Sequence, residues 1–178
     1  MVVLLVGEMA PDIDAVTTLG DRFVLSAQTS ICSIVYFFPK AFTPGCTKET
    51  RLFVENYNEI ALAGATIIGV STDDGETQCE FAQALGTPFA LIGDSDKSIS
   101  KAYGVLRGML GVAKRVTFVL SVEKRVLAVF HHDFAIDKHR DAVLPFVHDY
   151  CDEVRRQSQG LWSQALAASQ AKVQGHKS

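Results

Sequence analysis

The sequence predicts an α/β sandwich in which helices flank a mixed central sheet. Continuous apolar runs of strand length lie at Ile31–Phe38 and Ala65–Val70, which is typical of strands buried on both faces. Segments with a helical period of apolar residues separate and follow these runs. Two later strands, Val116–Ser121 and Val126–His132, are joined around a short polar turn and form an antiparallel pair.

The first half of the chain adds a hairpin and two helices to these strands. A turn within Val16–Leu25 predicts a short hairpin. The spacing of apolar residues predicts a helix over Thr47–Ala63, which Gly64 closes. A cluster of capping residues, Ser71–Asp74, predicts the start of a second helix, which runs to about Leu85.

The second half predicts three further elements. Pro88–Ile92 reads as a short strand and Ser95–Tyr103 as a short helix. A final helix runs from about Asp137 to Arg156. Pro145 kinks this helix, unless the helix starts at Asp141 and the proline falls in its first turn.

The chain of 178 residues predicts one domain over residues 1–156, followed by a C-terminal extension over 157–178. The extension is rich in Ala, Gln and Ser and carries the only tryptophan, Trp162. This composition is typical of a loose tail. The alternative is a helix, because Leu161, Ala165 and Leu166 lie near helical spacing. A helical extension can pack on this subunit or on a partner.

Composition excludes several classes of protein. The formal net charge of −3 gives no reason to expect nucleic-acid binding. No apolar run approaches the roughly 20 residues that a membrane span needs. The N-terminal MVVLLVGEMAPD has a short apolar run without a basic leader, unlike a signal peptide. These features predict a cytoplasmic protein.

The four cysteines, Cys32, Cys46, Cys79 and Cys151, form no CxxC pair. Their spacing therefore predicts neither a zinc ribbon nor a thioredoxin-type dithiol motif. The histidines show no metal-ligand spacing either. In a reducing compartment the cysteines are core thiols, or one of them is used for chemistry.

The stretch FFPKAFTPGCTKET places Cys46 at the start of a helix, directly after a buried strand. Unpaired backbone N–H groups and the positive end of the helix dipole stabilise a thiolate there. Gly45 lets a ligand approach the backbone, and Thr43 can aim its hydroxyl at the same point. Pro39 and Pro44 stiffen the turn. This pattern suits an activated nucleophile, and the alternative is a buried, inert cysteine.

These residues form the pattern Pro39-x-x-x-Thr43-x-x-Cys46. This pattern resembles the active-site signature of the peroxiredoxins. YFFPKAFTPGCTKE is similar to their bacterioferritin-comigratory-protein (Q-type) subfamily. GEMAPDI, IIGVSTD and KRVTFVL resemble further segments of the family in the same order. The resemblance covers about Val6 to Asp149 and implies a thioredoxin-like fold.

The resemblance also implies the role of each site residue. Cys46 is the peroxidatic thiolate, which attacks a peroxide and becomes a sulfenic acid. Thr43 hydrogen-bonds the peroxide, Arg115 stabilises the thiolate and the departing oxygen, and Pro39 shapes the pocket. The backbone N–H groups of Gly45 and Cys46 complete the cradle. No metal or bound organic cofactor is required.

One departure from the subfamily concerns the second, resolving cysteine. Many Q-type members carry it five residues after the first, where this chain has Arg51. Others carry it on the helix after the next strand, which here contains Cys79, so the resemblance implies a Cys46–Cys79 disulfide. The alternative is that Cys79 has no redox role. Cys32 and Cys151 are expected in the core.

The resemblance implies a peroxide substrate and a thioredoxin-like or small-thiol reductant, with a monomer or a homodimer as the assembly. Three alternatives stay open at this point. They are a one-cysteine peroxidase reduced by an external thiol, a peroxide-sensing relay protein, and a binding module without catalysis. The joint presence of Thr43, Cys46 and Arg115 argues against the last.

Overall fold

The computed structural model describes residues 2–131 and 136–174, with side chains described over 2–131 and 141–164. Its centre is a mixed five-stranded sheet in the order β5-β4-β3-β8-β9. The strands are β3 (Cys32–Phe37), β4 (Ala65–Ser71), β5 (Leu91–Gly93), β8 (Val116–Ser121) and β9 (Val126–His131). β3, β4 and β5 are parallel, while β8 pairs antiparallel with both β3 and β9. The predicted mixed sheet flanked by helices is confirmed.

The central strand β3 is buried along its whole length, as its unbroken apolar run predicts. Alternate side chains of β3 pack into two hydrophobic clusters, one on each face of the sheet. Tyr36 packs into the first cluster together with Phe53, whereas Phe37 packs into the second together with Phe118. A strand at the centre of two layers can position the residues that follow it rigidly.

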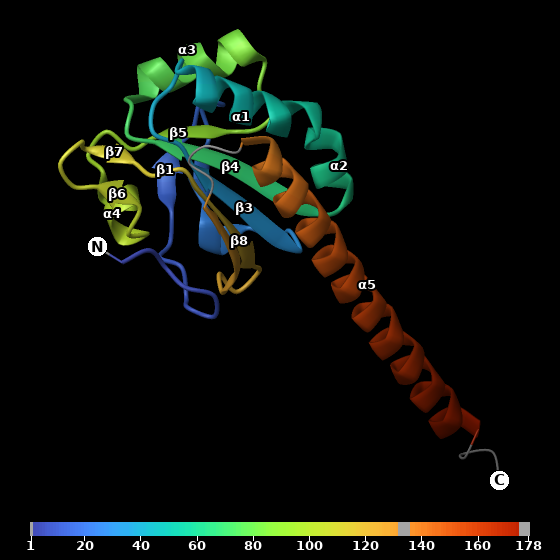
Figure 1. Ribbon diagram of the computed structural model, residues 1–178. Coiled ribbons are helices and arrows are strands. Elements are labelled where there is room, and N and C mark those ends of the chain that lie inside the picture. The colour runs from blue at the N-terminus through green and yellow to red at the C-terminus, as the bar shows by residue number, and fades with distance from the viewer. Residues whose placement is uncertain (1, 132–135, 175–178) are drawn as a thin grey trace.

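Helices cover the first face of the sheet (Figure 1). Phe53, Ile60, Phe81 and Val143 bring four of them into the same cluster. The α-helices within the described residues are α1 (Pro44–Glu55), α2 (Tyr57–Leu62), α3 (Gly75–Leu85), α4 (Ser98–Ala102) and α5 (Ile136–Gln174). None of the helices described is long and apolar enough to cross a membrane.

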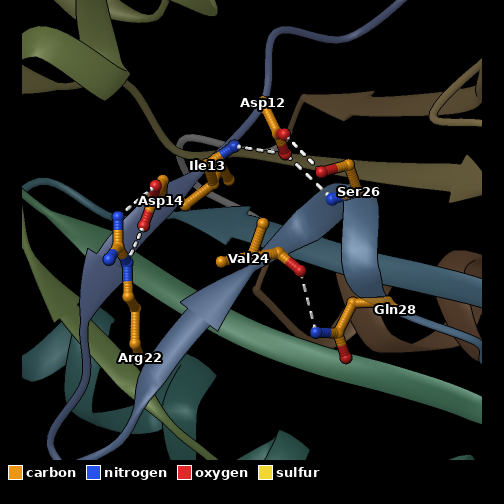
Figure 2. Close-up of polar contacts among 7 residues, drawn as sticks. All are labelled: Asp12, Ile13, Asp14, Arg22, Val24, Ser26 and Gln28. Carbon is orange, nitrogen blue, oxygen red and sulfur yellow. Dashed lines mark hydrogen bonds and ion pairs between the residues drawn. The ribbon is translucent and has the colours of Figure 1, made fainter.

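A hairpin of β1 (Asp14–Val16) and β2 (Arg22–Val24) lies on the second face, followed by a 3-10 turn over Leu25–Ala27. Figure 2 shows the Asp14–Arg22 ion pair across the two strands. It also shows Asp12 accepting hydrogen bonds from the backbone and side chain of Ser26. The predicted hairpin is confirmed.

The helix predicted over Thr47–Ala63 is two helices, and this prediction is corrected at both its start and its middle. α1 begins at Pro44, because proline suits the first helical position. The chain leaves helical geometry at Asn56, with φ −105° and ψ 9°. The Asn56 side chain donates to the Leu52 carbonyl over 2.7 Å, and such local bonds compete with the helix ladder.

Smaller differences concern short elements. The strand predicted at Pro88–Ile92 is Leu91–Gly93, and the helix predicted at Ser95–Tyr103 is confined to Ser98–Ala102. The hairpin of β6 (Leu106–Arg107) and β7 (Val112–Ala113) was not predicted. Two-residue strands are too short to show a period in the sequence.

The last helix, α5, is longer than predicted. It begins at Ile136, so Pro145 lies inside it, and it runs without a break to Gln174. The extension is therefore helical over 157–174. Figure 1 shows its far part projecting away from the body of the protein. Leu161 and Trp162 are exposed there.

Candidate active site

Cys46 lies in the first turn of α1, where the chain leaves the carboxyl end of β3. Thr43 is the N-cap residue with extended backbone, and Pro44 opens the helix. Backbone N–H groups in this first turn have no acceptor within the helix, and they carry the positive end of its dipole. The Cys46 side chain is only 1% exposed. The structure thus places a covered thiol against a positive potential.

Arg115 reaches the same point from the residue just before β8. Its Nη2 lies 3.3 Å from the Cys46 sulfur and donates to it. Its Nη1 donates to Glu49 on α1, and the two side chains form a buried ion pair. Burial alone would lower the pKa of Arg115, but the facing Glu49 and Cys46 outweigh it and raise that pKa. The guanidinium is therefore a fixed positive charge beside the thiol.

Glu49 follows Cys46 by three residues and shares its face of α1. It is 1% exposed, and burial raises the pKa of its carboxyl to about 7 even though Arg115 opposes the shift. The carboxyl accepts from Arg115 within the buried interior. A proton on Glu49 changes the net charge of this group of three residues near neutral pH.

The loop between β3 and α1 is fixed from outside the helix. Asp73, just after β4, accepts a hydrogen bond from the Ala41 backbone over 2.7 Å. Phe42 has a positive φ of 62° and packs its ring against Phe81 of α3. The Thr43 hydroxyl donates to the Lys40 carbonyl over 2.9 Å. Its lone pairs remain available to accept a hydrogen bond from a ligand.

Comparison with known proteins identifies the family. The model of the AhpC/TSA family matches residues 6–129. The chain belongs to this family. It is 32% identical to the chloroplastic peroxiredoxin Q of Arabidopsis thaliana over 142 residues, which is 79% of this chain and 66% of that protein. The subfamily is accordingly the Q-type, and the protein is a thiol peroxidase.

Solved structures agree with this assignment. Peroxidoxin BcpB from Mycobacterium tuberculosis is 32% identical with a TM-score of 0.75, over 81% of this chain and 96% of that one. Peroxiredoxin Q from Xanthomonas campestris is 31% identical with a TM-score of 0.71, over 78% and 91%. The thioredoxin-like fold expected for this peroxiredoxin is therefore confirmed.

The structure brings several of the predicted site residues together and leaves one of them, Cys79, apart. Cys46 and Arg115 are in direct contact, and Gly45 precedes the thiol in the first turn. Pro39 is half-buried at the start of the loop. Thr43 lies one turn before the thiol, and its hydroxyl donates to the Lys40 carbonyl, so toward a ligand it can act only as an acceptor.

Cys79 lies on α3, and its side chain is exposed. It lines a cavity of about 320 Å³ together with Val16, Thr18, Gly75 and Leu91. Phe81, two residues later, faces the active-site loop, and two residues correspond to about 200° around a helix. Cys79 therefore points away from the side of α3 that meets the loop, and all four cysteines are free thiols.

Two site residues were missed by sequence reasoning. Glu49 was missed because a charged residue on a helix usually faces water. Its spacing of three from Cys46 places it on the nucleophile's face, and that signal could have found it. The sequence predicts Asp73 as part of a capping cluster, but the cap of α3 is Asp74, which accepts from the Thr77 backbone. Asp73 instead anchors the active-site loop.

The raised pKa of Glu49 predicts a pH-dependent effect of Glu49→Gln on stability. A carboxyl with a folded pKa near 7 and an unfolded value of 4.5 stabilises the fold below pH 4.5, and that contribution is lost as the pH rises through 7. The free energy of unfolding of Glu49→Gln minus that of the wild type should therefore be about 2 kcal/mol larger at pH 8.5 than at pH 5.5. Urea unfolding at the two pH values measures this difference.

Glu55→Gln is the matched control for Glu49→Gln. Glu55 is exposed at the end of the same helix, so its replacement should change stability about equally at both pH values. Equal effects of Glu49→Gln at the two pH values would show that Glu49 stays ionised throughout this range.

Proposed function

We propose that this peroxiredoxin reduces hydrogen peroxide and organic hydroperoxides through the Cys46 thiolate. The observation that carries the proposal is the 3.3 Å contact between the Cys46 sulfur and Arg115 Nη2 at the first turn of α1. The positive end of a helix dipole and a buried guanidinium thus both lie beside the sulfur. The thiolate is the form of cysteine that attacks peroxides.

The proposed reaction begins with attack of the Cys46 sulfur on one peroxide oxygen. An S–O bond forms as the O–O bond breaks, and the second oxygen leaves as water or an alcohol after it takes a proton. Arg115 stabilises the charge that grows on the departing oxygen. Thr43 and the backbone N–H groups of Gly45 and Cys46 hold the peroxide. Pro39 helps to shape and shield the pocket.

The product of this step is a sulfenic acid on Cys46. We infer that Cys79 resolves it: the Cys79 sulfur attacks, water leaves, and an intramolecular disulfide forms. A thioredoxin-like protein or a small thiol then reduces the disulfide. Cys46 is buried, and Cys79 points away from the side of α3 that meets the active-site loop. The first turn of α1 and the segment around Cys79 must therefore unwind locally before the two sulfurs can meet.

Cytoplasmic location and a monomeric or homodimeric assembly stay predictions from the sequence. The boundary between a domain over residues 1–156 and an extension over 157–178 stays a prediction as well. α5 passes through this boundary without interruption, so the extension continues a helix that begins on the sheet.

The role of Cys46 is tested by Cys46→Ser. This variant should lose peroxide reduction, because a serine hydroxyl is not ionised at neutral pH and is not oxidised by peroxide. Stopped-flow consumption of hydrogen peroxide, with dithiothreitol as the reductant, measures the loss. Cys32→Ala is the control and should keep most of the activity. Substantial turnover in Cys46→Ser would refute the assignment of the nucleophile.

The role of Cys79 is tested by one equivalent of hydrogen peroxide. The wild type should lose two hydrogens and yield a linked Cys46–Cys79 peptide under non-reducing conditions. Cys79→Ser should instead accumulate a sulfenic acid on Cys46, which dimedone traps, while the peroxide step keeps its rate. Intact mass and peptide mapping measure both outcomes.

Other products of that experiment point to the alternatives. A stable sulfenic acid on wild-type Cys46 with free Cys79 contradicts the intramolecular disulfide and supports the one-cysteine mechanism. A link from Cys46 to another subunit also contradicts it. Rapid oxidation combined with slow reduction by thioredoxin would favour a peroxide-sensing relay.

A further inference from the structure

Two buried thiols meet where α5 packs on the sheet. Cys32 is the first residue of β3 and Cys151 lies on α5, 119 residues later in the sequence. Their sulfur atoms are 3.6 Å apart, and neither side chain is exposed. The proposed peroxidase reaction uses neither of them. The contact therefore needs its own explanation.

The pair lies at the opposite end of β3 from the peroxidatic site. Phe37 at the end of β3 pairs with Val116, which directly follows Arg115. Cys32 pairs with Ser121 at the far end of β8. The five residue-to-residue steps from Cys32 to Phe37 span roughly 16 Å, at about 3.3 Å each. Cys46 cannot exchange a disulfide with this pair without extensive unfolding.

Burial also keeps both groups protonated. It raises the pKa of Cys32, and the neighbouring Cys151 raises it further. Burial likewise raises the pKa of Cys151, although the hydrogen bond with Cys32 opposes the shift. Both are thiols at neutral pH, so they do not compete with Cys46 for peroxide during turnover.

We propose that Cys32 and Cys151 are a second redox-active pair, which excess peroxide converts into a disulfide that fastens α5 to the sheet. One thiol gives up its proton as its sulfur attacks the peroxide; an S–O bond forms, the O–O bond breaks, and the departing oxygen takes a proton and leaves as water or an alcohol. The second sulfur then attacks the sulfenic sulfur, an S–S bond forms, and water leaves. Two thiols and one peroxide thus yield one disulfide.

The surroundings of the pair permit this step and make it slow. A disulfide holds its sulfurs about 2.05 Å apart, so the two atoms must approach by about 1.5 Å, which side-chain rotation and a small shift of α5 can supply. Val147 of α5 is buried beside the pair, and Arg155 donates to the Leu62 carbonyl over 2.8 Å. α5 must therefore lift briefly before peroxide can reach either sulfur.

The disulfide would stabilise the attachment of α5. It closes a loop of more than a hundred residues, and such long loops lose the most chain entropy in the unfolded state. Among the α5 side chains described, over 141–164, the last buried one is that of Cys151, and the far part of the helix projects away (Figure 1). The cross-link would thus lie where the helix is packed on the body. This proposal goes beyond the peroxidase function and does not require Cys46.

The variant with both Cys46→Ser and Cys79→Ser tests the proposal, because it leaves only this pair of thiols. Prolonged incubation with excess hydrogen peroxide should remove two hydrogens per chain and yield a linked Cys32–Cys151 peptide. The Tm should rise by about 10 °C and return to its starting value with dithiothreitol. Intact mass, peptide mapping and calorimetry give these readouts.

Two persisting free thiols, a stable oxygen adduct on either sulfur without the disulfide, disulfide-linked dimers, or an unchanged Tm after cross-linking would each overturn the proposal. The matched control adds Cys151→Ala and should show neither the loss of mass nor the rise in Tm. Peptide mapping of the peroxide-treated wild type checks for the same Cys32–Cys151 link in the unaltered chain, and its absence there also overturns the proposal.

Discussion

The buried guanidinium of Arg115 is the interaction on which the site depends. A positive charge that is 7% exposed must be compensated by facing groups, because its loss of hydration is costly. Glu49 and Cys46, on one face of α1, provide that compensation. The same contact joins the start of β8 to the first turns of α1. The same three side chains thus form the reactive site and connect α1 to the sheet.

The mixed sheet explains why these residues meet. β3 and β8 are antiparallel neighbours, so the end of one strand lies beside the start of the other. The chain leaves β3 toward Cys46 and enters β8 from Arg115. The neighbouring strand β4 ends at the same edge, where Asp73 holds the backbone of the intervening loop at Ala41. Three strand ends therefore position the nucleophile, its cation and its loop.

Much of this arrangement could be predicted from the sequence, for physical reasons. Long apolar runs identify the central strands, and a proline–glycine turn before Cys46 identifies a helix start. Arg115 could be assigned only through the family resemblance, because nothing local shows that a cation before a strand turns inward. Glu49 was missed for the related reason that burial of a carboxylate depends on a partner distant in the sequence.

Other features depend on contacts that local patterns do not contain. Cys32 and Cys151 were each predicted as core residues, and both are buried, but their mutual contact depends on how α5 crosses the sheet. The break at Asn56 coincides with a side-chain hydrogen bond from Asn56 to the Leu52 carbonyl, which no local period in the sequence shows. The role of Cys79 stays a prediction, since the structure shows a reduced, exposed thiol that must move to meet Cys46.

The most direct test of the account is the reactivity of Cys46 in Arg115→Ala. The rate of Cys46 alkylation by iodoacetamide at neutral pH reports the fraction of thiolate. Loss of the guanidinium should lower this rate and the rate of peroxide reduction about tenfold, which corresponds to about 1.4 kcal/mol. Lys114→Ala, which removes the adjacent cation, should leave both rates unchanged. Equal rates in Arg115→Ala and the wild type would contradict the account.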